Sequence, residues 1–198
     1  MLIAVEGIDG TGKTTVSRYI VELLRKKGFE CVLLREPGDS EYGERIRNSK
    51  KRLSPEKELE LFMLDRIEDV RNNILPALEE GKVVVMDRYY FSSIAYQGAR
   101  GLDAEEIRKM NEKIAPKPDL VILLDAEPEV VLERIKSRGD LTPFEDLEYL
   151  KKVRENFLKY ADESTVIIDA SNPLDKVKEK VKRVICEFLN VNLQKNPD

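Results

Sequence analysis

The chain has 198 residues, which suits one domain, with 36% charged residues, a formal net charge of −4 and no histidine. This balance argues against a nucleic-acid partner, and the lack of imidazole excludes a Ser-His-Asp triad. No apolar run is long enough for a membrane helix and the two cysteines lack a metal-binding spacing, so we expect a cytoplasmic protein with no membrane contact.

Short apolar runs alternate with longer segments of helical periodicity along the chain. The runs are continuous rather than alternating, which is typical of strands buried on both faces. They lie at Leu2–Glu6, Cys31–Arg35, Val83–Asp87, Leu120–Asp125 and Val166–Asp169. This order predicts an α/β fold with a doubly wound parallel sheet of about five strands flanked by helices, in a single domain over residues 1–198.

The helices expected between these strands have recognisable boundaries. The first is expected to stop at Gly28, and Pro76 is expected to kink or end the helix that precedes it. Capping residues and first-turn prolines favour helix starts at Ser54-Pro55, Asp103, Pro128 and Asn172-Pro173.

A glycine-rich segment, EGIDGTGKTT, follows the first expected strand directly. Its spacing fits G-x-x-x-x-G-K-S/T, in which backbone N–H groups surround a phosphate. Lys13 would reach the β- and γ-phosphates of ATP, and the Thr14 hydroxyl would hold Mg²⁺. A strand before and a helix after favour this phosphate loop over a simple glycine-rich turn, and so a P-loop type of fold. The predicted nucleotide site comprises Gly7, Ile8, Asp9, Gly10, Thr11, Gly12, Lys13, Thr14 and Thr15.

Phosphate loops occur in kinases and in nucleotide-dependent switch proteins. A GTPase-like switch needs an N-K-x-D sequence, which is absent, and a D-x-x-G where Asp87-Arg88-Tyr89-Tyr90 stands. Asp87 and Arg88 follow a buried strand at the edge where open α/β sheets bind ligands. Asp87 could orient a magnesium water and Arg88 could clamp an acceptor phosphate, although an ion pair capping the strand is the structural alternative. Together with the phosphate loop, the pattern favours a kinase.

The motifs, in this order over nearly the whole chain, resemble those of thymidylate kinases. Besides the phosphate loop, the resemblance rests on REPG (35–38), GERIR (43–47), ELFMLDR (60–66) and DRYYFSSIAYQG (87–98). It implies transfer of the γ-phosphoryl group of MgATP to dTMP, giving dTDP and ADP. It also implies that the protein forms a homodimer. Two alternatives stay open, namely a kinase for another nucleoside monophosphate and a nucleotide-dependent binding protein with little turnover.

The resemblance also implies roles for individual residues in the acceptor site. Phe62 would stack on thymine and Arg66, one turn later, would bond its O4. Arg47 and Arg88 would bind the dTMP phosphate, and Asp9 would lie near the sugar 3′-hydroxyl. The other substrate residues that it implies are Glu36 and Pro37 of REPG, Ser93 and Gln97 near the base, and Tyr96 at the sugar 2′ position.

Residue types alone leave alternatives for three of these positions. Phe62 and Arg66 share a helix face because they are four residues apart. A helix phenylalanine is nevertheless most often a core residue, and Arg66 could form a surface ion pair with Glu68 or Asp69. Arg47 lies in a basic run, which usually forms a solvated face.

A lid over the phosphates is expected around residues 134–146, because kinases of this kind close a basic loop to exclude water. The segment lacks an arginine that many relatives carry, and Thr142-Pro143 also fits a plain helix start. Some family members have an arginine in the phosphate loop where this chain has Gly10. We therefore expect the catalytic arginine in the lid, at Arg138 first and Arg134 second. The other expected catalytic residues are Asp9, Lys13 and Arg88.

Overall fold

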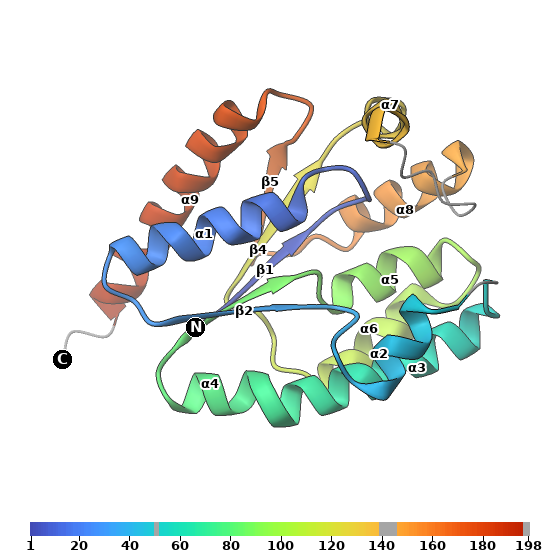
Figure 1. The fold of residues 1–198 in the computed structure, drawn as a ribbon, viewed down its shortest axis with the longest axis horizontal. Coiled ribbons are helices and arrows are strands. Elements are labelled where there is room, and N and C mark those ends of the chain that lie inside the picture. Colours follow the sequence, from blue (N-terminus) through green and yellow to red (C-terminus); the bar gives the residue numbers. More distant parts are fainter. Residues whose placement is uncertain (50–51, 139–145, 196–198) are drawn as a thin grey trace.

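The computed structural model describes residues 1–49, 52–138 and 146–195, and within them one parallel sheet forms the centre of the fold (Figure 1). Its strands are β1 (Leu2–Glu6), β2 (Cys31–Arg35), β3 (Val83–Asp87), β4 (Leu120–Asp125) and β5 (Thr165–Asp169). They lie in the order β2-β3-β1-β4-β5, and every neighbouring pair is parallel. The α/β fold class and all of the expected strands are thus confirmed, with β5 beginning one residue early.

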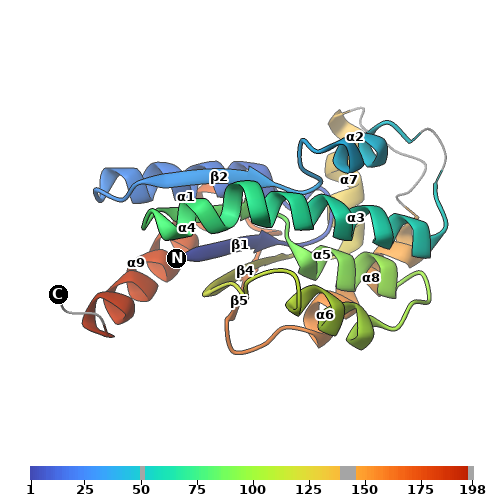
Figure 2. The same ribbon diagram turned by 90° about the horizontal axis from the view of Figure 1, so that it is seen from below.

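Helices cover both faces of the sheet (Figure 2). One face packs against α1 (Lys13–Lys26) and α9 (Leu174–Lys195). The other packs against a layer made of α3 (Pro55–Asp69), the π-helix η1 (Val70–Ile74), α4 (Leu75–Glu79), α5 (Tyr90–Gly98), α6 (Ala104–Glu112) and α8 (Leu147–Lys159). The remaining helices are α2 (Glu41–Arg47) and α7 (Pro128–Arg138), which lie near the carboxyl ends of the strands.

Burial of the strands on both faces holds only at the centre of the sheet. Every residue of β1 and β3 is buried, whereas Leu33 of β2 is 38% exposed and Ile167 of β5 is 50% exposed. β2 and β5 are the edge strands, so helices cover them incompletely. Continuous apolar sequence therefore indicated a parallel strand correctly but overstated the burial of the two edges.

Several helix boundaries follow from local chemistry. The Ser54 hydroxyl accepts a hydrogen bond from the backbone N–H of Lys57, and the Asp103 carboxylate accepts from Glu105 and Glu106, so both expected caps are confirmed. Pro76 does not end the helical segment in which it lies. The wider turn of η1 precedes Pro76, which then stands in the first turn of α4, and the helical segment continues to Glu79. The expected start at Thr142-Pro143 lies outside the described residues, and α8 begins after Asp146.

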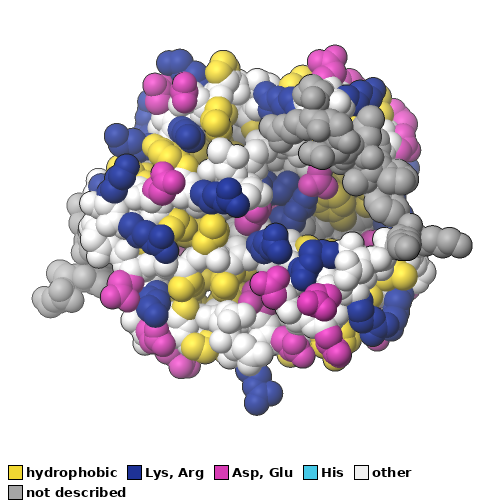
Figure 3. Space-filling view, in the orientation of Figure 1, with side chains coloured by type: hydrophobic (Ala, Val, Ile, Leu, Met, Phe, Trp, Pro, Cys, Tyr) yellow, Lys and Arg dark blue, Asp and Glu magenta, His cyan; other side chains and the backbone are white. Residues whose placement is uncertain are grey.

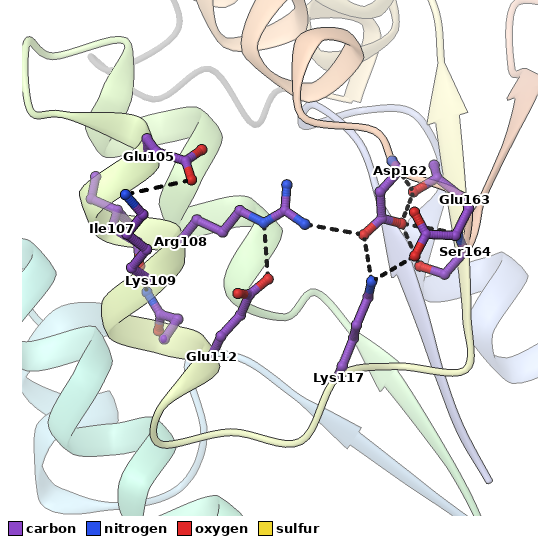
Figure 4. Close-up of polar contacts among 11 residues, drawn as sticks. Glu105, Ile107, Arg108, Lys109, Glu112, Lys117, Asp162, Glu163 and Ser164 are labelled. Carbon is purple, nitrogen blue, oxygen red and sulfur yellow. Dashed lines mark hydrogen bonds and ion pairs between the residues drawn. The ribbon is translucent and has the colours of Figure 1, made fainter.

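A charged cluster far from the carboxyl ends of the strands ties α6 to the segments that precede β4 and β5 (Figure 4). Arg108 bonds Glu112 at 2.9 Å and Asp162 at 3.4 Å, and Lys117 lies 3.1 Å from both Asp162 and Glu163.

In the described part of the chain, no helix is both long and apolar enough to cross a bilayer.

Candidate functional site

The phosphate loop runs from the end of β1 to the start of α1, and its glycines have positive φ. Gly7 has φ 138°, and a Cβ there would collide with the carbonyl oxygen of Leu124. A Cβ on Gly10 would lie 3.0 Å from the Ile135 side chain, because α7 packs against the loop at this point. These contacts explain why the turn needs glycine at both positions.

Lys13 lies inside this loop and is almost completely buried. Its ammonium donates to the carbonyl oxygens of Gly7 and Ile8, both at 2.9 Å, and lies 3.7 Å from the Asp9 carboxylate. Burial, with the nearby Arg88 charge, lowers the pKa of Lys13 to about 8, against the opposing effect of the carboxylates. The hydrogen bonds of this cation thus go to two neutral carbonyl groups that a phosphate could replace, with the Asp9 carboxylate farther away.

Thr14 at the start of α1 and Asp87 at the carboxyl end of β3 bring two side-chain oxygen atoms together. The Thr14 hydroxyl donates to the Asp87 carboxylate at 2.6 Å. Among the described residues there is no cluster of three His, Cys, Asp or Glu that could hold a metal by itself. Mg²⁺ commonly takes one or two protein oxygens and completes its shell with phosphates and water, so this pair fits that ion.

Arg88 stands at the junction between two cavities. It has φ 71°, in the left-handed region that non-glycine residues rarely adopt. Its guanidinium pairs with Asp9 and lies 5.5 Å from the centre of the Tyr96 ring. Burial raises the pKa of Asp9, but Arg88 and Lys13 together outweigh this and lower it to about 2. The Asp9–Arg88 pair is therefore fully charged at neutral pH.

The cavity on the phosphate-loop side has a volume of about 310 Å³, and the second, on the side of α3 and α5, about 300 Å³. Figure 3 shows a hollow on this face, bordered by basic side chains and with acidic ones inside it. Asp9, Glu36, Pro37 and Arg88 line both cavities. The second cavity is also lined by Phe62, Arg66, Ser93, Tyr96 and Gln97, so the structure brings together every predicted substrate residue except Arg47 there.

Arg66 forms a buried ion pair in the wall of this second cavity. It is 0% exposed, and its Nε donates to Glu36 at 2.8 Å while Nη2 contacts the other Glu36 oxygen. Further N–H groups reach Ser93 at 3.2 Å and Asn111. Burial raises the pKa of Glu36 to about 7 although Arg66 opposes the shift. The alternative of a surface ion pair with Glu68 or Asp69 is thus wrong.

Comparison with known proteins decides the family. A family model described as thymidylate kinase matches residues 5–181. The chain belongs to the thymidylate kinase family. A probable thymidylate kinase of Archaeoglobus fulgidus is 64% identical over 196 residues, which cover 99% of this chain and 100% of the relative. One from Pyrococcus horikoshii is 48% identical over 169 residues (81% and 82%), and the thymidylate kinase of Xylella fastidiosa strain 9a5c is 40% identical over 197 residues (98% and 94%).

Family membership makes the chain an enzyme, a kinase that phosphorylates dTMP to dTDP. The resemblance stated from the sequence motifs is therefore confirmed, and so is the choice of a kinase over a nucleotide switch. The parallel sheet with helices on both faces is the P-loop kinase fold of thymidylate kinases.

Arg47 of this thymidylate kinase family member lies in the wall of the phosphate-side cavity rather than with the base-site residues. Its Nη1 donates to the carbonyl oxygens of Pro37, at 2.9 Å, and Gly38, and its Nη2 lies 3.5 Å from Asp39. Arg47 thus braces the REPG segment, yet the residue stays exposed to solvent, as expected for a solvated basic run.

The two lid arginines differ in what the structure shows. Arg134 donates to the carbonyl oxygens of Ala170 at 2.7 Å and Ser171 at 2.9 Å, in the loop after β5, and lines neither cavity. Arg138 is the last residue of α7, but its side chain lies outside the described part of the chain. Residues 139–145 of the expected lid lie outside it as well.

Sequence reasoning did not assign several residues of the second cavity. They are Ile46, Arg52, Glu58, Ser92, Tyr149 and Leu150. Glu58 could have been found, because it precedes Phe62 by four residues and therefore shares its helix face. Tyr149 and Leu150 belong to α8, which carries no motif, and only the packing of α8 against α5 brings them to the site.

Proposed function

We propose that the enzyme transfers the γ-phosphoryl group of MgATP to dTMP, giving dTDP and ADP. The observation that carries the proposal is the pair of adjoining cavities that share Asp9 and Arg88. One cavity contains the phosphate loop. The other is lined by an aromatic ring and polar groups, and its volume suits a nucleoside. A donor phosphate in the first and an acceptor phosphate in the second would meet at Arg88.

On the donor side, the loop from Gly7 to Thr15 would bind the ATP phosphates. Lys13 would exchange its two carbonyl partners for phosphate oxygens, which gives charge-assisted bonds in place of neutral ones. Thr14 and Asp87 would hold Mg²⁺, directly or through its water, and the bound ion would neutralise phosphate charge. No general base of histidine type is required, since positioning and charge stabilisation dominate phosphoryl transfer.

On the acceptor side, Arg88 and Arg47 would hold the dTMP phosphate while Asp9 meets the 3′-hydroxyl of the sugar. Thymine would lie beside Phe62 and Arg66, with Ser93 and Gln97 near its edge and Tyr96 at the 2′ position. Glu36 and Pro37 support this arrangement because they border both cavities.

The catalytic arginine is proposed in a lid around residues 134–146 of a single kinase domain that spans residues 1–198. Arg134 would have to leave two backbone carbonyl groups to reach the phosphates, which favours Arg138. Arg138→Ala should lower kcat about a hundredfold, or ~2.7 kcal/mol, while KM for dTMP barely changes. The same pattern in Arg134→Ala would move the assignment, and a normal single-turnover rate in both variants would leave the segment without a catalytic role.

We also propose a cytoplasmic homodimer that binds neither nucleic acid nor membrane. Ile67 and Leu75 of the continuous helical path α3–η1–α4 and Met110 of α6 are large apolar side chains exposed to solvent. Exposed apolar side chains of this kind suit contact between copies of the chain. Light scattering at micromolar concentration should give twice the monomer mass, and a monomer would count against the dimer.

The experiment that tests the reaction supplies MgATP with a panel of nucleoside monophosphates and follows ADP release. We expect dTMP to react best and dUMP more slowly, because a missing methyl group in an apolar pocket is worth only ~1–3 kcal/mol. Faster reaction with AMP or GMP would make the base-site assignment wrong. If no acceptor stimulated ADP release, the proposed ATP donor would be wrong. ADP release that persists without Mg²⁺ would contradict the proposed metal.

A further inference from the structure

Glu6 is a fully buried carboxylate to which no substrate, metal or catalytic role has been given above. It ends β1, directly before the phosphate loop, and is 0% exposed. Its Oε1 accepts from the backbone N–H groups of Tyr89 at 2.8 Å and Ser92 at 3.1 Å, and its Oε2 accepts from the Ser92 hydroxyl at 2.7 Å. Buried carboxylates are retained only with such partners, and these partners all lie at the start of α5.

Glu6 acts as the amino-terminal cap of α5, although it comes from another part of the chain. Tyr89, the residue before the first turn, makes no side-chain capping bond of its own. The first N–H groups of a helix need acceptors, and a carboxylate also interacts favourably with this end of the helix dipole. The contact therefore fixes the start of α5 against the end of β1.

Arg88 lies between β3 and this capped helix start, and its backbone is strained at φ 71°. A non-glycine residue stays in that region only when its surroundings determine its conformation. The N–H of Arg88 donates to the Val5 carbonyl at 3.0 Å, and Glu6 holds the N–H of the next residue. Two adjacent residues of β1 thus hold the backbone on both sides of the Arg88 α-carbon.

The side chain of Arg88 is linked to Glu6 as well. The Ser92 hydroxyl gives its only proton to Glu6, so its lone pairs remain for the Arg88 Nη1, which lies 3.4 Å away. We infer that Glu6 is a positioning residue that holds Arg88, in backbone and side chain, where the acceptor phosphate binds. This rests on the role proposed above for Arg88.

Two substitutions of Glu6 separate this role from simple stabilisation. Glu6→Leu removes all three acceptor contacts, and we expect kcat/KM for dTMP at saturating ATP to fall about thirtyfold while KM for ATP changes less than about twofold. Glu6→Gln keeps a carbonyl oxygen for the two backbone N–H groups, and its amide can donate to Ser92, so activity should return to within about threefold of the wild type.

Asp103→Ala is the matched control, because Asp103 also caps a helix by accepting from two backbone N–H groups but lies on α6 and does not touch Arg88. It should lower the melting temperature and leave kcat/KM for dTMP unchanged. If Glu6→Leu lowered the melting temperature with no selective loss toward dTMP, the inference would be wrong. Should Glu6→Leu not fold, Glu6→Ala and Glu6→Gln are compared at a lower temperature, and equal values for dTMP would contradict it.

A double-mutant cycle with Arg88→Ala distinguishes the inference from the function on which it rests. If Glu6 acts through Arg88, Glu6→Leu should lower kcat/KM for dTMP less than about threefold in the Arg88→Ala background. A full thirtyfold loss there would overturn the inference. Normal activity of Arg88→Ala by itself would instead remove the proposed role of Arg88.

Discussion

The two ends of the proposed active site hold their cations in different ways. At the base end, Arg66 is paired with the Glu36 carboxylate inside the protein. At the phosphate end, Lys13 and Arg47 donate their hydrogen bonds to backbone carbonyl groups, which carry no charge. The carboxylates near these two cations, Asp9 at 3.7 Å and Asp39 at 3.5 Å, are more distant and exposed to solvent. A phosphate that displaces a carbonyl group gains a charge-assisted bond, whereas one that displaced Glu36 would have to separate a buried ion pair. The phosphate end is therefore ready to exchange partners, and the base end keeps those it has.

Arg88 shares a feature with each end. Its partner is a carboxylate, as at the base end, but this carboxylate is partly open to solvent. The Asp9 side chain is 41% exposed, while that of Arg88 is 21% exposed. An incoming phosphate can thus approach Arg88 without first burying or expelling its partner. The comparison predicts that substitutions at the phosphate end change catalysis most, and that substitutions at the base end change stability as well.

The largest effect is expected for Arg88→Ala. Losing a charge-assisted phosphate contact in a closed site should lower kcat/KM for dTMP about a thousandfold, or ~4 kcal/mol, and leave ATP affinity nearly unchanged. Steady-state kinetics and ATP titration measure the two quantities. Arg108→Ala in the remote cluster of Figure 4 is the control and should retain full activity. Wild-type activity of Arg88→Ala would reduce Arg88 to an ion pair that caps a strand.

A smaller effect, on stability, is expected for Arg66→Met at the base end. The substitution leaves Glu36 buried without its cation, and breaking a buried pair in this way costs ~3–5 kcal/mol, toward the lower limit here because Glu36 can take up a proton. Urea unfolding measures the change. Arg108→Met breaks a pair with the partly exposed Glu112 and leaves the buried Asp162 paired with Lys117, so it should cost less than ~1 kcal/mol. Equal losses in the two variants would show that burial of the Arg66 pair has no special importance.

The sequence predicted those features that depend on neighbouring residues. The strands appear as continuous apolar runs, and the phosphate loop is a motif whose glycines, lysine and threonine act within one turn. The caps at Ser54 and Asp103 are equally local, because each side chain bonds N–H groups two or three residues away.

Features that depend on distant segments could not be read in this way. The partner of Arg66 stands 30 residues earlier, so charge patterns on its own helix pointed to Glu68 and Asp69 instead. Glu6 was part of a strand pattern, and its bonds to Tyr89 and Ser92 depend on the place of α5 beside β1. Arg134 has helix spacing that suits a lid, but the loop after β5 supplies its acceptors. In each case the tertiary fold, and not the local pattern, determines the partner.

The smallest effect is expected in the pH dependence of kcat/KM, which should differ between ATP and dTMP. Burial and the Arg88 charge lower the pKa of Lys13 to about 8, so its ammonium group is charged below this pH and loses its proton above it. Since kcat/KM reports groups of the free enzyme, kcat/KM for ATP should be level near pH 7 and fall about tenfold per pH unit well above pH 8. At saturating ATP the bound phosphates keep Lys13 protonated, and arginine stays charged at any such pH. The value for dTMP should therefore stay level from pH 7.5 to 9.

Lys13→Arg is the control for that profile, because a guanidinium group does not titrate in this range. Its activity should be lower throughout, yet the alkaline decline in kcat/KM for ATP should disappear. A wild-type profile that stayed level to pH 10 would mean that Lys13 keeps its proton in the free enzyme. A decline that persisted in Lys13→Arg would assign the titration to another group. The pH profile would then give no support to the proposal that ATP phosphates replace the carbonyl partners of Lys13.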